Sequence, residues 1–231
     1  MSKKVAILQS NYIPWKGYFD LIHSVDEFVL YDDMQYTKND WRNRNMIKSS
    51  QGPLWVTIPV RQLSLHQKIN ETKTANPIWR KKHWTTIQSN YAKAPFFKRY
   101  EEHFKELYLG SNEELLSHIN YAFIQTICSI LGITTPIRWS HEFELTQGKS
   151  ERLVDLCQQL HATDYISGPA ARDYLDEKMF ATAGIQVTYF DYSGYKEYEQ
   201  FYPPFTHYVS MIDLIFHQGD QAPMFMKTWT N

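Results

Sequence analysis

The sequence predicts an α/β fold, a mostly parallel, Rossmann-like sheet with a helical block inserted or packed beside it. Residues 5–8 and 28–31 are continuous apolar runs of strand length, and apolar residues at helical spacing separate them. The same alternation of strand, helix and strand returns between residues 150 and 190. Apolar stripes at helical spacing fill residues 77–132. We therefore expect a single α/β domain over residues 1–231, in which 77–132 form a helical subdomain.

The first half of the chain carries local signals for a hairpin after the opening strand–helix–strand unit. Pro14 and Gly17 end the first strand region and precede a short helix. Strand-like residues at 45–47 and 54–60 flank the turn 49–53, which predicts a hairpin. The polar stretch 62–76 predicts a loop or a ragged strand.

The helical block begins at Pro77, which suits the first turn of a helix. Its first helix carries a stripe of Ile78, Trp79, Trp84, Ile87 and Tyr91. A second helix is expected from residue 94 to Gly110. Ser111 and Glu114 have the spacing of a capping box and predict the start of a long helix that ends at Gly132.

The last hundred residues return to α/β alternation. Strands are expected at 137–139, 164–167 and 185–190, with helices at 150–161 and within 174–183. An aromatic loop fills 192–205, and Ser210 is expected to cap a final helix that Gly219 closes.

Charge and hydropathy limit the partners of the chain. The 24 Lys and Arg nearly cancel the 25 Asp and Glu, so no long-range attraction to nucleic acid acts on the whole chain, and we expect no DNA partner. No apolar run approaches a membrane span, and the first residues lead directly into a strand rather than a signal peptide. We expect a cytoplasmic protein without membrane insertion.

The aromatic content, with 16 Tyr, 13 Phe and 7 Trp, favours an amphipathic pocket or an interface in addition to a core. Cys128 and Cys157 each lie in an apolar helical pattern, without a second cysteine or a histidine at ligand spacing. Both are therefore expected to be small buried hydrophobic residues.

Polar residues gather where the first two predicted strands end. Gln9 and Asn11 follow the first strand, and Asp32 follows the second. The carboxyl ends of parallel strands meet at one edge of the sheet, which is where open α/β sheets bind ligands. We expect the functional site there.

Two further stretches predict anion binding. The first offers Asp40, Trp41, Arg42 and Arg44 within five residues, and each guanidinium presents a planar fork suited to phosphate or carboxylate. The alternative is a solvated run of salt bridges. In the second, Ser167 and Arg172 flank a glycine turn between a strand and a helix, an anion-binding arrangement that can equally be an ordinary βα turn.

No standard catalytic, nucleotide-binding or metal-binding motif occurs. The loose cluster His141, Glu142 and Glu144 is typical of plain surface. We expect neither a metal nor a cofactor.

Long blocks of the chain resemble the WbqC-like protein family. They are residues 8–22, 32–36, 40–45, 55–60, 165–168 with 172–175, and 210–214. The resemblance implies a place among bacterial O-antigen and other surface-polysaccharide clusters, whose members have been proposed to act as glycine or acyl transferases on amino sugars. It names no catalytic residue. A weaker likeness links residues 14–18 to the nucleotidylyltransferases, but Trp15 and Tyr18 stand where that group has histidines, so nucleotidylyl transfer is not expected.

The resemblance and the residues together predict an N-acyl transferase. The acyl group is expected to be an aminoacyl group, and more narrowly glycyl. The substrate would be a nucleotide-linked amino sugar, such as a dTDP-4-amino-4,6-dideoxyhexose, used in O-antigen and lipopolysaccharide biosynthesis. The donor stays open between glycine with ATP, a thioester and a charged tRNA, and the near-neutral charge disfavours tRNA. The alternative is a non-catalytic module that binds a nucleotide-sugar or a partner of the same pathway.

Such a transferase assigns roles to the candidate residues. A pyrophosphate would contact the cations, a base ring would stack on aromatic residues, and the sugar amine needs a general base. The developing oxyanion needs donors, for which Gln9 and Asn11 are expected. The candidates are Arg42, Arg44, Lys48 and Arg172 for the pyrophosphate; Trp15, Tyr18 and Trp41 for stacking; Ser167 as a further substrate-binding residue; and Asp32, Asp40 and His83 as bases.

Overall fold

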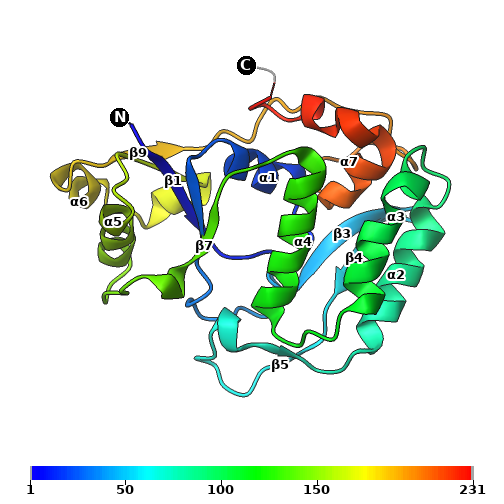
Figure 1. The fold of residues 1–231 in the computed structure, drawn as a ribbon, viewed down its shortest axis with the longest axis horizontal. Helices are drawn as coiled ribbons and strands as arrows, with labels where there is room; N and C mark the ends of the chain where they lie inside the picture. Colours follow the sequence, from blue (N-terminus) through cyan, green and yellow to red (C-terminus); the bar gives the residue numbers. More distant parts are fainter. Residues whose placement is uncertain (1, 230–231) are drawn as a thin grey trace.

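A computed structural model describes residues 2–229 and confirms the α/β fold. Its centre is a sheet of five strands, all parallel, in the order β7-β2-β1-β8-β9 (Figure 1). The strands are β1 (Lys4–Leu8), β2 (Glu27–Leu30), β7 (Ile137–Trp139), β8 (Asp164–Ser167) and β9 (Gln186–Tyr189).

The order of the strands places a topological switch point between β1 and β8. From β1 the chain moves one way through β2 to β7, and then crosses to the other side through β8 to β9. The β1–β8 ladder pairs only Lys4 with Asp164 and Val5 with Tyr165. The ladder between β1 and β2, in contrast, continues to Leu8. The carboxyl ends of β1 and β8 are therefore not joined by ladder hydrogen bonds, and a crevice can open there.

Helices cover both faces of the sheet. Alternate strand residues point to opposite sides, and apolar residues on each side form a separate core with the helices there. Ala6 and Phe28 belong to a core that includes α1 (Lys16–His23), α4 (Leu116–Leu131) and α7 (Met211–Gln218). Val5 and Val29 belong to a second core with α5 (Ser150–Gln159) and α6 (Glu177–Thr182). Figure 1 shows α5 and α6 on one side of the sheet and α1, α4 and α7 on the other.

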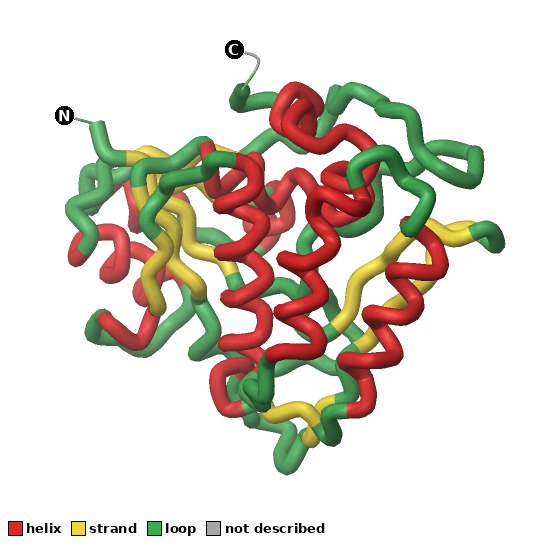
Figure 2. The backbone as a smooth tube through the Cα atoms, turned by 45° about the vertical axis from the view of Figure 1, so that its right-hand side comes forward, coloured by secondary structure: helices red, strands yellow, loops and turns green. Residues whose placement is uncertain are grey.

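The chain between β2 and β7 builds the hairpins and helices that lie beside the sheet. The predicted hairpin is β3 (Arg44–Ser49) with β4 (Gly52–Thr57), and a smaller one joins β5 (Val60–Arg61) to β6 (Lys73–Thr74). The helices α2 (Ile78–Tyr91), α3 (Phe97–Lys105) and α4 follow. Figure 2 shows these helices as neighbouring rods beside the sheet, and Figure 1 shows β3 and β4 between α4 on one side and α2 and α3 on the other. Whether they form a separate subdomain stays a prediction.

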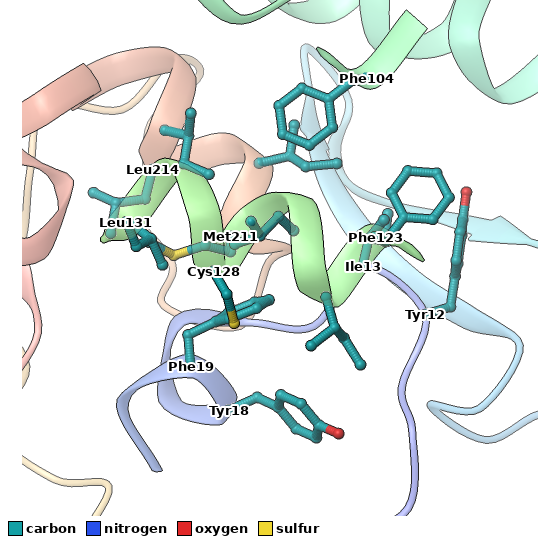
Figure 3. Packing of buried hydrophobic residues seen from close by; sticks show 14 of the residues in the cluster. Tyr12, Ile13, Tyr18, Phe19, Phe104, Phe123, Cys128, Leu131, Met211 and Leu214 are labelled. Atoms are coloured by element: carbon teal, nitrogen blue, oxygen red, sulfur yellow. The ribbon is translucent and has the colours of Figure 1, made fainter. Parts of the chain in front are cut away.

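Helix α4 links this block to the sheet. Its residues Phe123, Cys128 and Leu131 are buried, and Figure 3 shows Cys128 beside Phe19 of α1 and Leu131 close to Leu214 of α7. Both cysteines are free and buried, as expected from the sequence. Burial raises the pKa of each thiol to about 12, so neither is a reactive thiolate at neutral pH.

Two local predictions about the helical block were wrong. Helix α4 begins at Leu116 rather than at the predicted capping box, because Leu115 forms a bridge with Lys73 and the Leu116 N–H donates to the carbonyl of Thr72. The backbone of Glu114 and Leu115 is instead capped by the Glu113 carboxylate, at 2.8 Å in each case. Ile78 was expected to face inward but is 73 % exposed.

The predicted cap of the last helix is confirmed, since Ser210 Oγ accepts from the N–H of Ile212 at 3.3 Å. Within residues 2–229, none of the helices combines the length and the hydropathy that crossing a bilayer requires.

Candidate functional site

A cavity of about 680 Å³ lies at the switch point, where the ladder between β1 and β8 stops. Leu8 and Gln9 line it from β1 and its following loop, and Ser167 and Gly168 line it from β8. Small residues, Ala170 and Ala171, continue its wall into the next turn. A ligand can therefore approach the backbone of this turn closely. We call this space the switch cavity.

The cationic side of the switch cavity comes from the start of α5. Lys149 and Arg152 both line it. Arg152 is held in place because its Nε donates to the carbonyl of Thr146 at 2.6 Å and its side chain hydrogen-bonds with Tyr31. The remaining N–H donors of the guanidinium can bind an anion. Because α5 follows a strand of a parallel sheet, its N-terminus also faces this edge and favours negative charge.

Aromatic side chains complete the switch cavity. Tyr31 and Tyr165 are largely buried, and Tyr174 is 56 % exposed at the rim. Burial raises the pKa of Tyr31, an effect that the nearby Arg152 opposes. These tyrosines stay protonated at neutral pH and offer ring faces as well as hydroxyl groups.

Two buried side chains, Asp32 and Tyr18, hold the loop after β1 in place. The Asp32 carboxylate accepts from the backbone N–H of Ser10 at 2.8 Å and from its hydroxyl at 2.6 Å. Asp32 is only 1 % exposed, and burial raises its pKa although the Ser10 bonds oppose this. The Tyr18 hydroxyl donates to the carbonyl of Gln9 at 3.1 Å from a buried position. Both side chains thus hold the loop, and neither presents a surface to a ligand in this structure.

A second, smaller cavity of about 230 Å³ lies at the other end of the same loop. Asn11, Trp15, Trp41, Asn45 and Tyr208 line it, and we call it the aromatic pocket. The loop enters it through a strained residue: Ile13 has a φ of +37°, which is unusual for a β-branched side chain. Asn45 stabilises this conformation, because its amide nitrogen donates to the carbonyls of Tyr12 and Ile13 at 3.1 and 2.9 Å.

The Asp40–Arg44 cluster divides between two environments. Arg42 donates to the amide oxygen of Asn11, and its other terminal nitrogen lies 3.6 Å from the Asp40 carboxylate. Arg44 turns away, with its guanidinium 4.2 Å from the centre of the Trp55 ring. Arg42 and Asp40 therefore reach the border of the aromatic pocket through Asn11, whereas Arg44 packs on the hairpin.

Eight predicted residues line neither cavity: Tyr18, Asp32, Asp40, Arg42 and Arg44, described above, and also Lys48, His83 and Arg172. Lys48 is 1 % exposed and donates to the carbonyl of Pro204. His83 is 4 % exposed, with Nδ1 at 2.9 Å from the Tyr12 hydroxyl, and burial lowers its pKa to about 4. Arg172 is exposed and stacks over Tyr189 at 4.7 Å. Their catalytic or binding roles stay predictions.

Five of the thirteen expected residues thus line a cavity, and they divide between two neighbouring cavities. Gln9 and Ser167 line the switch cavity, and Asn11, Trp15 and Trp41 line the aromatic pocket. Sequence reasoning missed Lys149 and Arg152. A signal existed, since both residues flank the start of a predicted helix that follows a parallel strand and so begins at the ligand edge.

The described residues, 2–229, contain no group of three or more His, Cys, Asp or Glu side chains arranged to hold a metal ion. In the switch cavity the donors are amides, hydroxyl groups and two cations, which suit an organic anion rather than a cation.

Comparison with known proteins places the chain in a family. The WbqC-like protein family profile matches residues 9–224. The chain is also 50 % identical over 226 residues to uncharacterized protein Rv1507c of Mycobacterium tuberculosis (strain ATCC 25618 / H37Rv). The aligned region covers 97 % of this chain and 98 % of that protein. No solved structure matches the chain. The matched range includes both cavities almost entirely, and the chain belongs to the WbqC-like protein family.

Proposed function

We propose that this protein binds a nucleotide-linked amino sugar in the switch cavity and transfers an acyl group, glycyl in the simplest case, to the sugar amine. The observation that carries the proposal is the switch cavity itself. It lies at the carboxyl edge of a parallel sheet where the strand order reverses, and two cations line it. Open α/β sheets bind nucleotides at this position.

The chemistry of the walls suits the nucleotide part of such a substrate. Arg152 can form a bidentate contact with a pyrophosphate, and Lys149 adds a second positive charge. Tyr174 at the rim and Tyr31 deeper inside offer faces for a pyrimidine ring. The volume of about 680 Å³ lies within the range of pockets that hold ligands of this size.

The transfer step needs a neutral amine and a stabilised oxyanion. The amine nitrogen forms a bond to the acyl carbon, the bond from that carbon to the donor's leaving group breaks, and the amine proton passes to a base. Asp40 is the predicted base with the most accessible carboxylate, 30 % exposed, beside Trp41 of the aromatic pocket. The Asn11 amide and Arg42 are donors for the oxyanion.

A specific observation favours the second candidate, a non-catalytic nucleotide-sugar-binding module. Among the described residues that line the switch cavity there is no carboxylate and no imidazole. If the acyl acceptor lies wholly within this cavity, no conventional base reaches it. Turnover therefore separates the two candidates.

The test is calorimetry with dTDP and with a dTDP-amino sugar, on the wild type and on Arg152→Ala. Loss of a charged hydrogen-bond partner should weaken binding by about 1.5–3 kcal/mol. Arg99→Ala is a matched control, because Arg99 is an exposed arginine paired with Asp220 on α3 and away from both cavities. Absence of dTDP binding, or equal weakening by both variants, would contradict the proposed site.

Acyl transfer is then tested by mass spectrometry of the sugar after incubation with glycine and ATP, a glycyl thioester or glycyl-tRNA. A mass increase that Asp40→Asn abolishes supports the transferase. Tight binding without a mass increase for any of these donors supports the module instead.

A further inference from the structure

The aromatic pocket has the composition of a carbohydrate site. Trp15 and Tyr208 form one wall, with ring centres 6.1 Å apart and ring planes 33° from parallel. Trp41 lies in the turn before β3, and its ring centre is 5.3 Å from that of Trp55 in β4. Trp41 is 41 % exposed and Tyr208 is 68 % exposed. Exposure of several large rings around one hollow is costly in water and indicates a ligand.

The walls of the aromatic pocket are held apart by the fold. The N–H of Tyr12 donates to the carbonyl of Trp41 at 2.9 Å, which fixes Trp41 to the loop. On the other side, the Trp15 indole lies directly on Gly17, so closely that a Cβ there would be 2.4 Å from the ring. Trp15 also forms a bridge with Ser210 at the start of α7. The pocket therefore exists before a ligand arrives, which lowers the entropy cost of binding.

The polar groups of the pocket are few and oriented. Arg42 occupies the amide oxygen of Asn11 and so directs the amide nitrogen, a two-proton donor, to other partners. Asp40, 3.6 Å from Arg42, adds an acceptor at the border. The amide nitrogen of Asn45 donates to the carbonyls of Tyr12 and Ile13, so Asn45 lines the pocket without offering this donor to a ligand. Donors and acceptors of both kinds beside ring faces suit a ligand with hydroxyl or amine groups around an apolar ring surface.

The size and the charge of the aromatic pocket limit the ligands that it can hold. The volume of about 230 Å³ is below the usual range for a whole nucleotide and leaves room for a single ring. The 6.1 Å between the ring centres of Trp15 and Tyr208 leaves no room for a ring between them, so a ligand packs against the wall that the two side chains form together. The Asp40 carboxylate disfavours a phosphate at the border. The size and the charge therefore favour a single ring that is uncharged or cationic.

The two cavities are close enough for one extended substrate. Gln9 lines the switch cavity and Asn11 lines the aromatic pocket, so their Cα atoms are at most ~7 Å apart. A diphosphate that leaves the switch cavity along this loop would carry the attached sugar toward the aromatic pocket.

We infer that the aromatic pocket is a pyranose subsite that binds an amino sugar ring against Trp15, Trp41 and Tyr208. In taking that ring as part of the nucleotide-linked substrate, the inference rests on the proposed function. The existence of the subsite does not depend on the proposed function, because its walls and donors would also bind the free glycoside, although weakly. It assigns the ring to the aromatic residues and the nucleobase to the switch cavity.

The experiment uses saturation-transfer NMR with methyl 4-amino-4,6-dideoxyglucoside and no nucleotide. Transfer to the ring protons is expected in the wild type. It should fall roughly two- to tenfold in Tyr208→Ala and Trp41→Ala, the range for loss of one aromatic contact. Tyr174→Ala is the matched control, because it removes an exposed tyrosine from the switch cavity instead. Circular dichroism of each variant checks that the protein is folded.

Three outcomes separate the ideas. Transfer that depends on Tyr208 and Trp41 but not on Tyr174 supports the subsite, whether or not dTDP binds. No transfer in the wild type, or transfer that survives both pocket variants, overturns the subsite. If the glycoside contacts the aromatic pocket while calorimetry shows no dTDP binding, the proposed nucleotide function fails and the carbohydrate subsite stands.

Discussion

The Asp32 carboxylate binds both hydrogen-bond donors of Ser10, its backbone N–H at 2.8 Å and its hydroxyl at 2.6 Å. This pair joins the ends of two neighbouring strands, because Ser10 follows β1 and Asp32 follows β2. The loop that runs from the switch cavity to the aromatic pocket begins at this junction. Asp32 therefore fixes the start of the loop that connects the two cavities.

Asp32→Asn should destabilise the fold. The asparagine oxygen can accept only one of the two Ser10 donors, while its NH2 group faces the other donor in a buried position. We expect the free energy of unfolding to fall by about 1–3 kcal/mol, measured by urea denaturation. A double-mutant cycle with Ser10→Ala should show coupling between the two residues. Unchanged stability with complete loss of transfer would instead identify Asp32 as the catalytic base.

Arg42 and Arg44 should respond differently to substitution, although the sequence treats them alike. Arg42→Ala frees Asn11 and removes a donor from the pocket border, so binding of a dTDP-amino sugar should weaken by about 1.5–3 kcal/mol. Arg42→Lys should recover only part of this, because it lacks the fork. Arg44→Ala should leave affinity unchanged, since Arg44 stacks on Trp55. Calorimetry measures the affinity of all three variants. Equal losses of affinity for Arg42→Ala and Arg44→Ala would contradict the different roles of the two arginines.

Lys16 should make stability rise at alkaline pH. Burial lowers the pKa of Lys16 to about 8 from 10.5, although Asp20 and Asp213 oppose the shift. Between these two values the unfolded chain keeps a proton that the folded chain has lost, so unfolding takes up a proton and becomes less favourable as the pH rises. The stability that this group contributes is present above pH 10.5 and is lost as the pH falls through 8.

Relative to Lys16→Met, the wild type should therefore gain at most about 1.4 kcal/mol per pH unit between the two pKa values. Urea denaturation of both proteins at pH 7.5 and at pH 9.5 measures this. The comparison cancels the tyrosines that titrate in the same range. A difference that does not change with pH would show that Lys16 keeps its proton among the rings of Tyr195 and Tyr198.

His83 should control stability in mild acid. Burial lowers its pKa to about 4 from 6.5, so the imidazole is neutral in the folded protein at neutral pH. Its contribution to stability is present above pH 6.5 and is lost as the pH falls through 4, since the unfolded chain takes up the proton first. The loss of melting temperature between pH 6.5 and pH 4.5 should be smaller in His83→Gln than in the wild type. Identical profiles would contradict a buried neutral His83.

Gly17→Ala should displace the Trp15 indole. The added methyl would lie 2.4 Å from the ring, so the ring must rotate away from the aromatic pocket. Near-ultraviolet circular dichroism should change while far-ultraviolet circular dichroism stays the same, because alanine is a good helix former at the start of α1. Glycoside contacts should weaken in the same variant. The matched control is Gly52→Ala at the hairpin turn, where a Cβ meets no atom within 4 Å among the described residues, although the φ of +99° imposes a local backbone cost.

The sequence alone determined the α/β class, the β3–β4 hairpin and most helix positions. These follow from apolar periodicity and from glycine and proline signals, which act over a few residues. It also determined the edge where Gln9 and Ser167 meet, since parallel strands bring their carboxyl ends together. The two cysteines were correctly expected to be buried, because apolar helical neighbours surround both.

Only the tertiary structure decided which polar residues face a ligand. Arg42 and Arg44 are two residues apart, yet one contacts Asn11 and the other Trp55. Likewise, the bridge between Lys73 and Leu115 overrode the capping pattern at Ser111. Lys149 and Arg152 joined the site because α5 begins beside a crevice that depends on the strand order. Such contacts join residues far apart in the chain, and their energies depend on burial and on the partner present, which local patterns do not contain.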